Sequence, residues 1–379
     1  MEIRRYLHQH PELSGFEYET TRYLAGLLEE SGIAYRLGPD NRGLIVDFGS
    51  ENATHRLALR ADIDAVPVND SKNVEYRSQV KNAAHACGHD AHSAILFGTV
   101  VSLQRWFCKE NPSVAIRAIF QPEEETIQGA KRLIEWGVLD GVNAIMGLHV
   151  DPDRAVGTVA LKAGAITAQC DEVFVEVVGQ GGHAARPHET RDPIAAATQF
   201  LSACYHLVPR ALNSHQPTVL SFGSIAGGDA CNVIPGSVSI KGTLRTVSDV
   251  SRATAVEKIQ QIADGISLAT GTRVQLDWGA SVPPVLADRH LTEVVQMAST
   301  ELLGSSNVTS ISRASMGGDD FAFYSRTLPA SFMRIGCAGQ RCGNIPLHNP
   351  AFDVDEKVLP IGAKVLSMSA VHYFCQTNC

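Results

Sequence analysis

His85-Ala86-Cys87-Gly88-His89-Asp90 is followed at once by Ala91–Phe107, an apolar run at helical spacing. Cys87 and His89 are two residues apart, so both side chains can face one point on an extended or turning backbone. Together, a thiolate and an imidazole form a donor set for a transition metal rather than for calcium or magnesium. A single cysteine near a helix start is usually a small buried side chain, but this pair in a glycine-containing loop favours a metal site.

Strand-like runs surround this segment. Gly43–Phe48 and Arg56–Arg60 precede it, Ser113–Phe120 and Asn143–Val150 follow it, and a helical stretch is expected at Gly129–Trp136. Strands that alternate with helices predict an α/β fold, here a mixed sheet flanked by helices. Because such sheets place their sites where strands run into loops, we expect polar residues at the strand ends to be functional.

The middle third of the chain has a different pattern. Between Asp171 and Trp278 the expected order is strand, helix, strand, strand, helix, strand. This is the order of a ferredoxin-like α+β unit. The α/β pattern resumes after it, so we expect a main domain made of residues 1–167 and 280–379, interrupted by an inserted domain at residues 168–279.

The composition is that of a globular protein with a well-buried core. The chain has 379 residues, of which 44% are apolar and 19% charged, and a net charge of −8 without a block of Lys or Arg. Nucleic acid is therefore not an expected partner. No apolar run looks long enough to cross a bilayer, so a membrane is not expected either.

The cysteines indicate a reducing compartment. The nine cysteines are scattered and no CxxC occurs, which argues against a disulfide framework or a zinc ribbon. No apolar signal-peptide segment follows Met1 in this sequence. We expect free thiols and a cytoplasmic location.

Three further segments carry metal-binding side chains. The triplet Glu123–Glu125 directly follows the strand Ser113–Phe120, His149 ends another strand, and His348 lies in the tight loop Pro346–Pro350. An acidic triplet is often only a solvated loop, and single histidines at strand ends are common. Metal-assisted hydrolysis, however, needs one carboxylate on the ion and an unbound one that takes a proton from water. Adjacent glutamates can divide those two roles.

Other polar residues near these segments are explained by structural roles or by positioning of a ligand. Asp62 and Asp64 could be turn formers, and Asp64 could equally orient a ligand imidazole. His85 and His92 are expected to cap a helix or to orient a ligand. The chain has no G-x-S-x-G nucleophile motif, and Gly179–His183 is not a dinucleotide fingerprint.

At this point the segments resemble a known family, the aminoacylase/carboxypeptidase superfamily of dinuclear metallohydrolases. The most similar branch is that of the hippurate hydrolases and indole-acetyl-amino-acid hydrolases, which use a cysteine ligand where relatives use a bridging aspartate. The resemblance covers essentially the whole chain in the same order, through Leu7–Leu13, Arg60–Pro67, His85–Asp90, Phe120–Glu125, Gly182–His188, Asn232–Pro235, Gly242–Thr246 and Leu347–Pro350.

The resemblance implies a role for each residue of the metal site. Cys87 would bridge two divalent metal ions (manganese, zinc, cobalt or iron), and Glu124 would be the general base that activates a metal-bridging water. Asp64 would assist at the same site. The remaining metal ligands implied by the resemblance are His89, Glu125, His149 and His348.

The inserted domain resembles the dimerisation lid of the family. The resemblance implies that His183 hydrogen-bonds the scissile carbonyl in the partner subunit's site of a homodimer. Asn232 and Arg245 would hold the carboxylate of the substrate.

The implied activity is hydrolysis of a small-molecule N-acyl amino acid of the hippurate, N-acetyl or indole-acetyl type. A dipeptidase or carboxypeptidase would use the same dinuclear site and remains the alternative. Two segments depart from the branch: Gly318–Phe321 shortens one carboxylate, and Thr126–Gln128 replaces a glycine-rich loop. Both departures concern the substrate preference rather than the metal chemistry.

Overall fold

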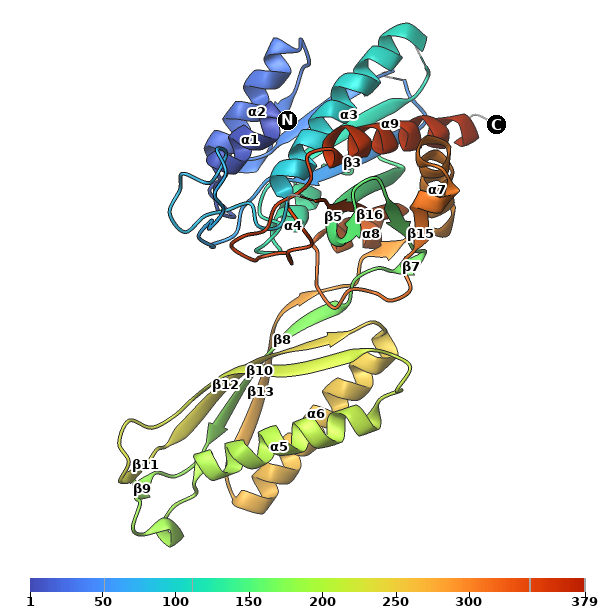
Figure 1. Ribbon diagram of the computed structural model, residues 1–379. Coiled ribbons are helices and arrows are strands. Elements are labelled where there is room, and N and C mark those ends of the chain that lie inside the picture. The colour runs from blue at the N-terminus through green and yellow to red at the C-terminus, as the bar shows by residue number, and fades with distance from the viewer. Residues whose placement is uncertain (51, 111, 341, 378–379) are drawn as a thin grey trace. The chain divides into compact units, whose positions relative to one another are not determined.

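The chain folds into two compact units. The computed structural model describes residues 1–50, 52–110, 112–340 and 342–377. The first unit comprises Met1–Ile166, Val285–Arg313 and Asp319–Cys379, and the second comprises Thr167–Pro284 together with Ala314–Gly318. Each unit has its own sheet and its own core (Figure 1).

The first unit is built on an eight-stranded mixed sheet. Its middle strands, β4, β3, β5 and β16, run parallel to one another, whereas β1 and β2 pair antiparallel with their neighbours. The strand β6 is antiparallel to β16 and parallel to β15. In spatial order the strands are β1 (Arg36–Leu37), β2 (Leu44–Gly49), β4 (Ala115–Gln121), β3 (Arg56–Asp62), β5 (Ala144–Ala155), β16 (Ala330–Ala338), β6 (Val159–Leu161) and β15 (Val308–Ser310). A small separate sheet pairs β7 (Gly164–Ala165) with β14 (Leu286–Ala287).

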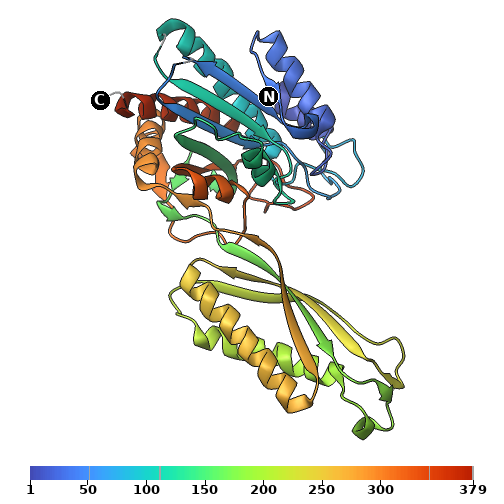
Figure 2. The same cartoon turned by 180° about the vertical axis from the view of Figure 1, so that it is seen from behind.

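Helices cover both faces of this sheet, as the alternation of strands and helices predicts. Along β3, Leu57, Leu59 and Ala61 belong to the larger core, so the alternate residues Ala58, Arg60 and Asp62 face the other way. The larger core is covered by α1 (Glu2–Gln9), α2 (Tyr18–Glu30), α3 (His89–Glu110), α7 (Arg289–Leu303) and α9 (Val358–Thr377), and the opposite face by α4 (Gly129–Glu135) and α8 (Phe321–Thr327) (Figures 1 and 2).

The helix α9 departs from one expectation. Its stretch Val358–Gln376 is long and apolar enough to cross a membrane by length and composition, so the expectation that the chain has no such run is wrong. Half of this stretch is buried, and the helix packs against α3 and α7. Burial on several sides explains its apolar composition.

The second unit has the expected ferredoxin-like order β-α-β-β-α-β. Its antiparallel sheet has the spatial order β10, β12, β8, β13, and both long helices pack on one face of it around Phe200, Ile240 and Ile259. Figure 2 shows these helices from behind. The elements are β8 (Gln169–Val178), α5 (Pro193–Ala211), β10 (Thr218–Ala226), β12 (Ser237–Thr246), α6 (Asp249–Thr270) and β13 (Arg273–Val282), with a small ribbon of β9 (Gly182–His183) and β11 (Val233–Ile234).

Candidate metal centre

The loop before α3 brings a thiol and an imidazole to the carboxyl ends of the central strands. Gly88 separates Cys87 from His89 and has a φ of +88°, a conformation that residues with a side chain rarely adopt. A Cβ atom at Gly88 would lie 2.5 Å from the Cγ2 atom of Val150. The glycine therefore allows the loop to turn tightly against β5, where His149 is located.

Five predicted ligands form two groups that share one sulfur. The ligand atoms of Cys87, His89 and His149 lie within 4.8 Å of one another, and so do those of Cys87, Glu125 and His348. Cys87 Sγ is 3.5 Å from His149 Nε2, and Glu125 Oε1 is 3.2 Å from His348 Nε2. Ligands that surround a tetrahedral ion at 2.0–2.3 Å stand roughly 3.3–3.8 Å apart. Each group therefore has the dimensions of a metal site.

Unpaired atoms in these groups also fit a cation. The buried atom His89 Nε2 has no hydrogen-bond partner among the described residues, and the buried Glu125 Oε1 faces another predicted ligand, His348, at 3.2 Å. Buried polar atoms without a partner are rare because they are costly. Burial, and then the nearby Glu125 carboxylate, raises the pKa of the Cys87 thiol well above its usual value. A bound cation would coordinate His89 Nε2 and Glu125 Oε1 and keep the sulfur of Cys87 ionised.

The histidine His149 is held in the form that a metal requires. Burial, followed by the charge of Arg334, lowers the pKa of His149 well below its usual value, so its ring is neutral. Its Nδ1 atom is 2.7 Å from the carbonyl oxygen of Val150. That hydrogen bond leaves Nε2, the atom nearest Cys87, free to bind an ion.

The last predicted ligand, His348, lies in a loop with a constrained backbone. His348 has a φ of +63°, which is unusual for a residue with a side chain. Its backbone N–H donates to the carbonyl oxygen of Ala86 at 2.7 Å, and the carbonyl of Pro350 accepts from Ser71 N–H at 2.9 Å. These two hydrogen bonds fix the loop beside Cys87.

The carboxylates of the two glutamates in the acidic turn have partly different neighbours. Glu125 belongs to a ligand group with Cys87, whereas Glu124 also lies within 4.8 Å of the carboxylates of Asp319 and Asp320. Burial, and then the charge of Asp319, raises the pKa of Glu124 well above its usual value. The turn is shaped by Gly129, where a Cβ atom would lie 1.8 Å from the carbonyl oxygen of Pro122.

Asp64 joins a ligand histidine to the acidic turn. Its Oδ1 and backbone oxygen lie 3.1 and 3.0 Å from His89 Nδ1, and its Oδ2 accepts from the backbone N–H of Glu125 at 2.9 Å. Because Nδ1 of His89 is engaged, Nε2 is the nitrogen available to a metal. The geometry therefore favours orientation of a ligand over turn formation for this aspartate.

The flanking histidines differ from one another. His92 Nδ1 is 2.6 Å from Asp62, and its Nε2 accepts from Val150 N–H at 2.9 Å, so both ring nitrogens are used in positioning. His85 is buried, burial lowers its pKa to about 3, and neither ring nitrogen has a hydrogen-bond partner among the described residues. The described residues therefore show neither helix capping by His85 nor orientation of a ligand by it.

Sequence reasoning missed a buried network beneath the acidic turn. Asp320 accepts hydrogen bonds from Arg60 at 2.6 Å, from Gln121 at 2.7 Å and from the backbone N–H of Ala130 at 2.8 Å. These contacts connect β3, β4, α4 and the start of α8. The only signal in the sequence was Arg60 itself, a charged residue in an otherwise apolar strand.

The other three predicted site residues belong to the second unit. His183 is paired with Val233 between β9 and β11, and Ala184 N–H donates to the carbonyl oxygen of Asn232 at 3.1 Å. Arg245 lies near the far end of β12, where its guanidinium donates to the carbonyl oxygen of Met316 at 2.7 Å. Ser237, next to the His183 ribbon, and Arg245 are eight residues apart along one strand, or roughly 26 Å. A single chain therefore does not bring Asn232 and Arg245 together.

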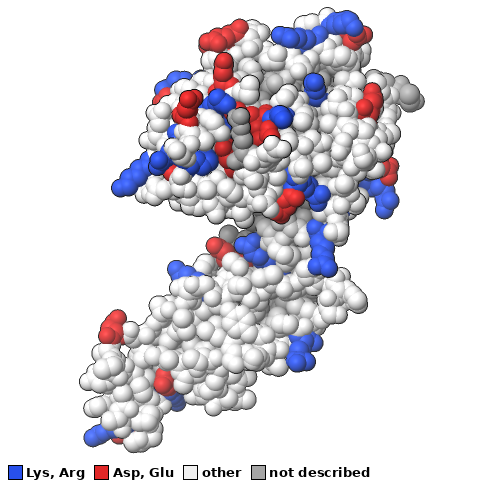
Figure 3. Space-filling model, in the orientation of Figure 1, with Lys and Arg blue, Asp and Glu red and all other residues white. Residues whose placement is uncertain are grey.

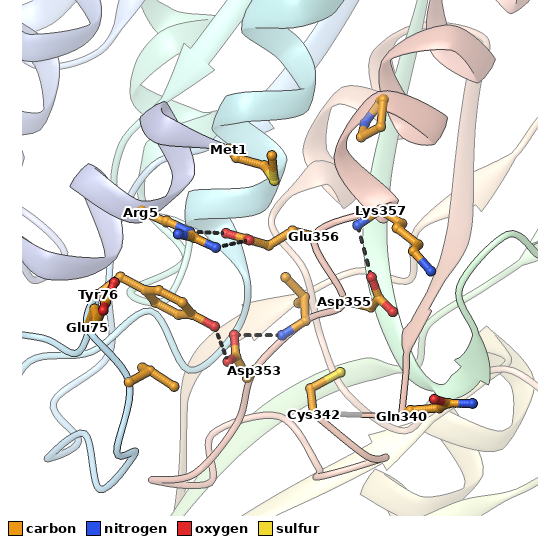
Figure 4. Close-up of a pocket in the computed structure, with 13 residues that line it drawn as sticks. Met1, Arg5, Glu75, Tyr76, Gln340, Cys342, Asp353, Asp355, Glu356 and Lys357 are labelled. Atoms are coloured by element: carbon orange, nitrogen blue, oxygen red, sulfur yellow. Dashed lines mark hydrogen bonds and ion pairs between the residues drawn. The ribbon is translucent and has the colours of Figure 1, made fainter.

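A pocket of about 970 Å³ lies elsewhere in the first unit (Figure 4). Its walls include Arg5, which is paired with Glu356, and Tyr76, which donates to Asp353 at 2.7 Å. None of the predicted site residues lines it. Its main polar side chains are thus already paired with each other, unlike those of the metal groups.

Comparison with known proteins places this geometry in a family. The model of peptidase family M20/M25/M40 matches residues 58–371. N-acetyl-L-cysteine deacetylase of Bacillus subtilis (strain 168) is 40% identical over 361 residues, covering 94% of this chain and 84% of that protein. IAA-amino acid hydrolase ILR1-like 4 of Arabidopsis thaliana is 34% identical over 379 residues, covering 99% of this chain and 85% of that protein.

A solved structure shows the same fold. The crystal structure of the Bacillus subtilis YXEP protein, described as a dinuclear metal binding peptidase from the M20 family, is 33% identical to this chain. It superposes with a TM-score of 0.86 and covers 98% of this chain and 96% of that one. The candidate ligand groups and these relatives agree on the cofactor, two divalent metal ions. The chain belongs to peptidase family M20/M25/M40, within its amidohydrolase branch, and is a metal-dependent hydrolase of amide bonds.

Proposed function

We propose that this enzyme cleaves the amide bond of N-acyl amino acids, releasing a carboxylic acid and a free amino acid. One observation carries the proposal: two ion-sized groups share Cys87, and the Glu124 carboxylate lies beside them, within 4.8 Å of the ligand atoms of His89 and Glu125. Two relatives are named for substrates of this kind, N-acetyl-L-cysteine and an IAA-amino acid.

The proposed metal ligands are Cys87 as the bridge, with His89, Glu125, His149 and His348. When bound, two divalent ions lower the pKa of water from about 15.7 toward roughly 7 and polarise the scissile carbonyl. Glu124 takes the proton of the attacking water and later delivers it to the leaving nitrogen. Burial, and then the charge of Asp319, raises the pKa of Glu124 above its usual value, which makes the ionised carboxylate a stronger base.

The second unit is proposed to complete the site as the lid of a homodimer. His183 and Asn232 lie at one end of its sheet and Arg245 at the other. If all three act on one substrate, two chains must supply them, because the two ends of one sheet are too far apart. We propose that His183 comes from the partner subunit. His183 would then donate to the carbonyl oxygen, and Arg245 and Asn232 would hold the carboxylate of the amino acid.

The surface of the second unit fits such a dimer. Figure 3 shows that its visible face carries few charged side chains. Large apolar residues are exposed on α5, β10 and β11, namely Ile194, Tyr205, Leu207, Val219, Ile225 and Val233. Apolar patches of this kind mark interaction surfaces.

A dipeptidase or carboxypeptidase is the alternative, because it would use the same ligands and the related YXEP protein is described as a peptidase. Hydrolysis of hippurate, N-acetyl and indole-acetyl amino acids with added manganese, cobalt or zinc tests the proposal, with a panel of dipeptides alongside. Thiolate ligation disfavours magnesium. Faster turnover of dipeptides than of every acyl amino acid would overturn the proposal in favour of the alternative.

We also propose that the enzyme works in a reducing compartment such as the cytoplasm. The cysteines Cys87, Cys108, Cys170, Cys204, Cys231, Cys337 and Cys342 are free thiols. An oxidising environment would expose the proposed thiolate ligand to oxidation.

A further inference from the structure

Arg334 lies beside the metal centre on the neighbouring strand. In the parallel pairing of β16 with β5, Arg334 is directly opposite His149. Residues that are opposite each other in a sheet extend to the same face. The side chain of Arg334 is partly buried, so a positive charge lies on the face of the sheet from which His149 reaches the ligand group.

The guanidinium of Arg334 has no polar partner among the residues that the structure describes. It lies over the ring of Phe332, whose centroid is 5.5 Å from the guanidinium carbon, and its charge acts on His149 and Asp319 without a hydrogen bond to either. Arg60, on the same face of the sheet, differs sharply: its guanidinium reaches Gln121, Asp62 and Asp320 at 2.6–2.8 Å. A partly buried cation without hydrogen bonds is costly, and the fold satisfies Arg60 but leaves Arg334 unpaired.

Aromatic rings pack on one side of Arg334, and the buried Asp319 carboxylate is near enough for the charge of Arg334 to act on it. Phe332 packs against Phe321 with ring centroids 4.7 Å apart, and Gly147 on β5 leaves room for both rings. An apolar surrounding strengthens the attraction between a guanidinium and an incoming anion. Arginine binds a carboxylate through two parallel hydrogen bonds and stays charged at every physiological pH.

We propose that Arg334 binds a second carboxylate of the substrate, so that this enzyme prefers N-acyl amino acids that carry two negative charges. The proposal rests on the proposed function, in which Arg245 and Asn232 take the first carboxylate. The second carboxylate can come from the amino acid, as in an acyl-glutamate, or from the acyl group, as in a succinyl amide. Both sources present the same chemistry to the guanidinium.

Two substrate pairs separate the sources. N-acetyl-L-glutamate is compared with N-acetyl-L-glutamine, and N-succinyl-L-alanine with its half-amide, by kcat/KM. For at least one pair we expect the wild-type enzyme to prefer the dianion by about ten- to a hundredfold, the usual worth of a hydrogen-bonded charge pair. Arg334→Gln should abolish that preference and leave kcat/KM for the singly charged amide within about twofold of the wild-type value. Arg334→Lys should retain part of the preference.

A binding measurement and a control variant complete the design. In the Glu124→Gln background, calorimetric titration should show weaker binding of the preferred dianion when Arg334 is also replaced. Arg22→Gln, which removes an exposed arginine of α2, should change neither substrate ratio. Circular dichroism and metal content verify that each variant is folded and loaded.

The outcomes distinguish this proposal from the one on which it rests. Hydrolysis of N-acetyl-L-alanine without any preference for dianions would overturn the role of Arg334 and leave the proposed function standing. An equal loss on all substrates in Arg334→Gln would also overturn it, because the residue would then act on His149 rather than on a carboxylate. If the wild-type enzyme hydrolyses none of the acyl amino acids, both proposals are overturned.

Discussion

Glu124 and Glu125 are neighbours in the sequence, and both lie in one group with His89, but the rest of their neighbours differ. Glu125 lies with Cys87 and His348, and Glu124 with Asp319 and Asp320. This separation is what a hydrolytic site requires, because a carboxylate bound to an ion is a poor base. The proposed division of roles between the two residues can be tested by substitution.

Glu124→Gln should bind metal normally and lose most of its turnover. The amide cannot accept a proton, so kcat should fall on the order of a hundredfold to ten-thousandfold. Measurement requires steady-state kinetics together with elemental analysis of the same sample. A variant that keeps its metal and a kcat within tenfold of the wild type would exclude Glu124 as the base.

Cys87→Ala should lose metal, because one sulfur belongs to both ligand groups. We expect the metal content to fall from about two ions per chain to one or none. Cys108→Ala is the matched control, since Cys108 is an exposed free cysteine of α3. Two tightly bound ions in Cys87→Ala would rule out the bridging role.

The candidate ligand residues could be predicted from their side-chain chemistry. The residues that lie beside them could not, because that depends on the register of the paired strands. A cysteine and a histidine two residues apart carry a signal of their own. Arg334 carries none, because its position beside His149 follows from the pairing of two strands far apart in sequence. The hydrogen bonds of His92 and Asp62 were equally invisible, since nothing in the sequence indicates which atoms meet.

At the scale of elements, the acidic turn after β4 is shaped by its backbone. Glu123 and Ile127 both have a φ of +60°, and they flank the two functional glutamates. Left-handed residues with side chains are strained and persist only where the surroundings hold them. Gly129 closes this turn against Pro122.

Gly129→Ala should destabilise the first unit, because its new methyl group would overlap the carbonyl oxygen of Pro122. We expect a loss of at least about 2 kcal/mol in the free energy of unfolding, measured by urea denaturation without metal. Gly26→Ala is the matched control: it lies inside α2 with open space around it and should be neutral or stabilising by about 0.4–1 kcal/mol. Equal stability of the two variants would contradict the steric argument.

The order of elements was predictable from alternation, but some of their limits were not. The strand expected at Thr272–Trp278 continues as β13 to Val282, with a register shift after Trp278. The Gly-Ala-Ser sequence there reads as a turn, yet the sheet accommodates it as a bulge. The three-residue strands β6 and β15 were missed because so short a run has no periodicity.

At the scale of the whole molecule, the proposed exchange of His183 between subunits gives a quantitative test. An equal mixture of Glu124→Gln and His183→Ala chains, unfolded and refolded together, should regain about a quarter of wild-type activity. Half of the dimers are then mixed, and one of the two sites in each has both residues intact.

Each variant refolded alone is the control and should stay inactive. If His183 served its own chain, every site in the mixture would lack one residue, and activity would not return. A monomer by sedimentation analysis would contradict the lid dimer directly.

The proposed ligands come from both sides of the inserted unit in the sequence: Cys87, His89, Glu125 and His149 precede it, whereas His348 follows it. During synthesis, the early ligands emerge long before the residue that closes the cage. A growing polypeptide therefore cannot complete both ligand groups until His348 has been synthesised. The group of Cys87, His89 and His149 is synthesised before the inserted unit, whereas the group of Cys87, Glu125 and His348 is completed only after it. Capture of the second ion is in this sense a late event of biogenesis.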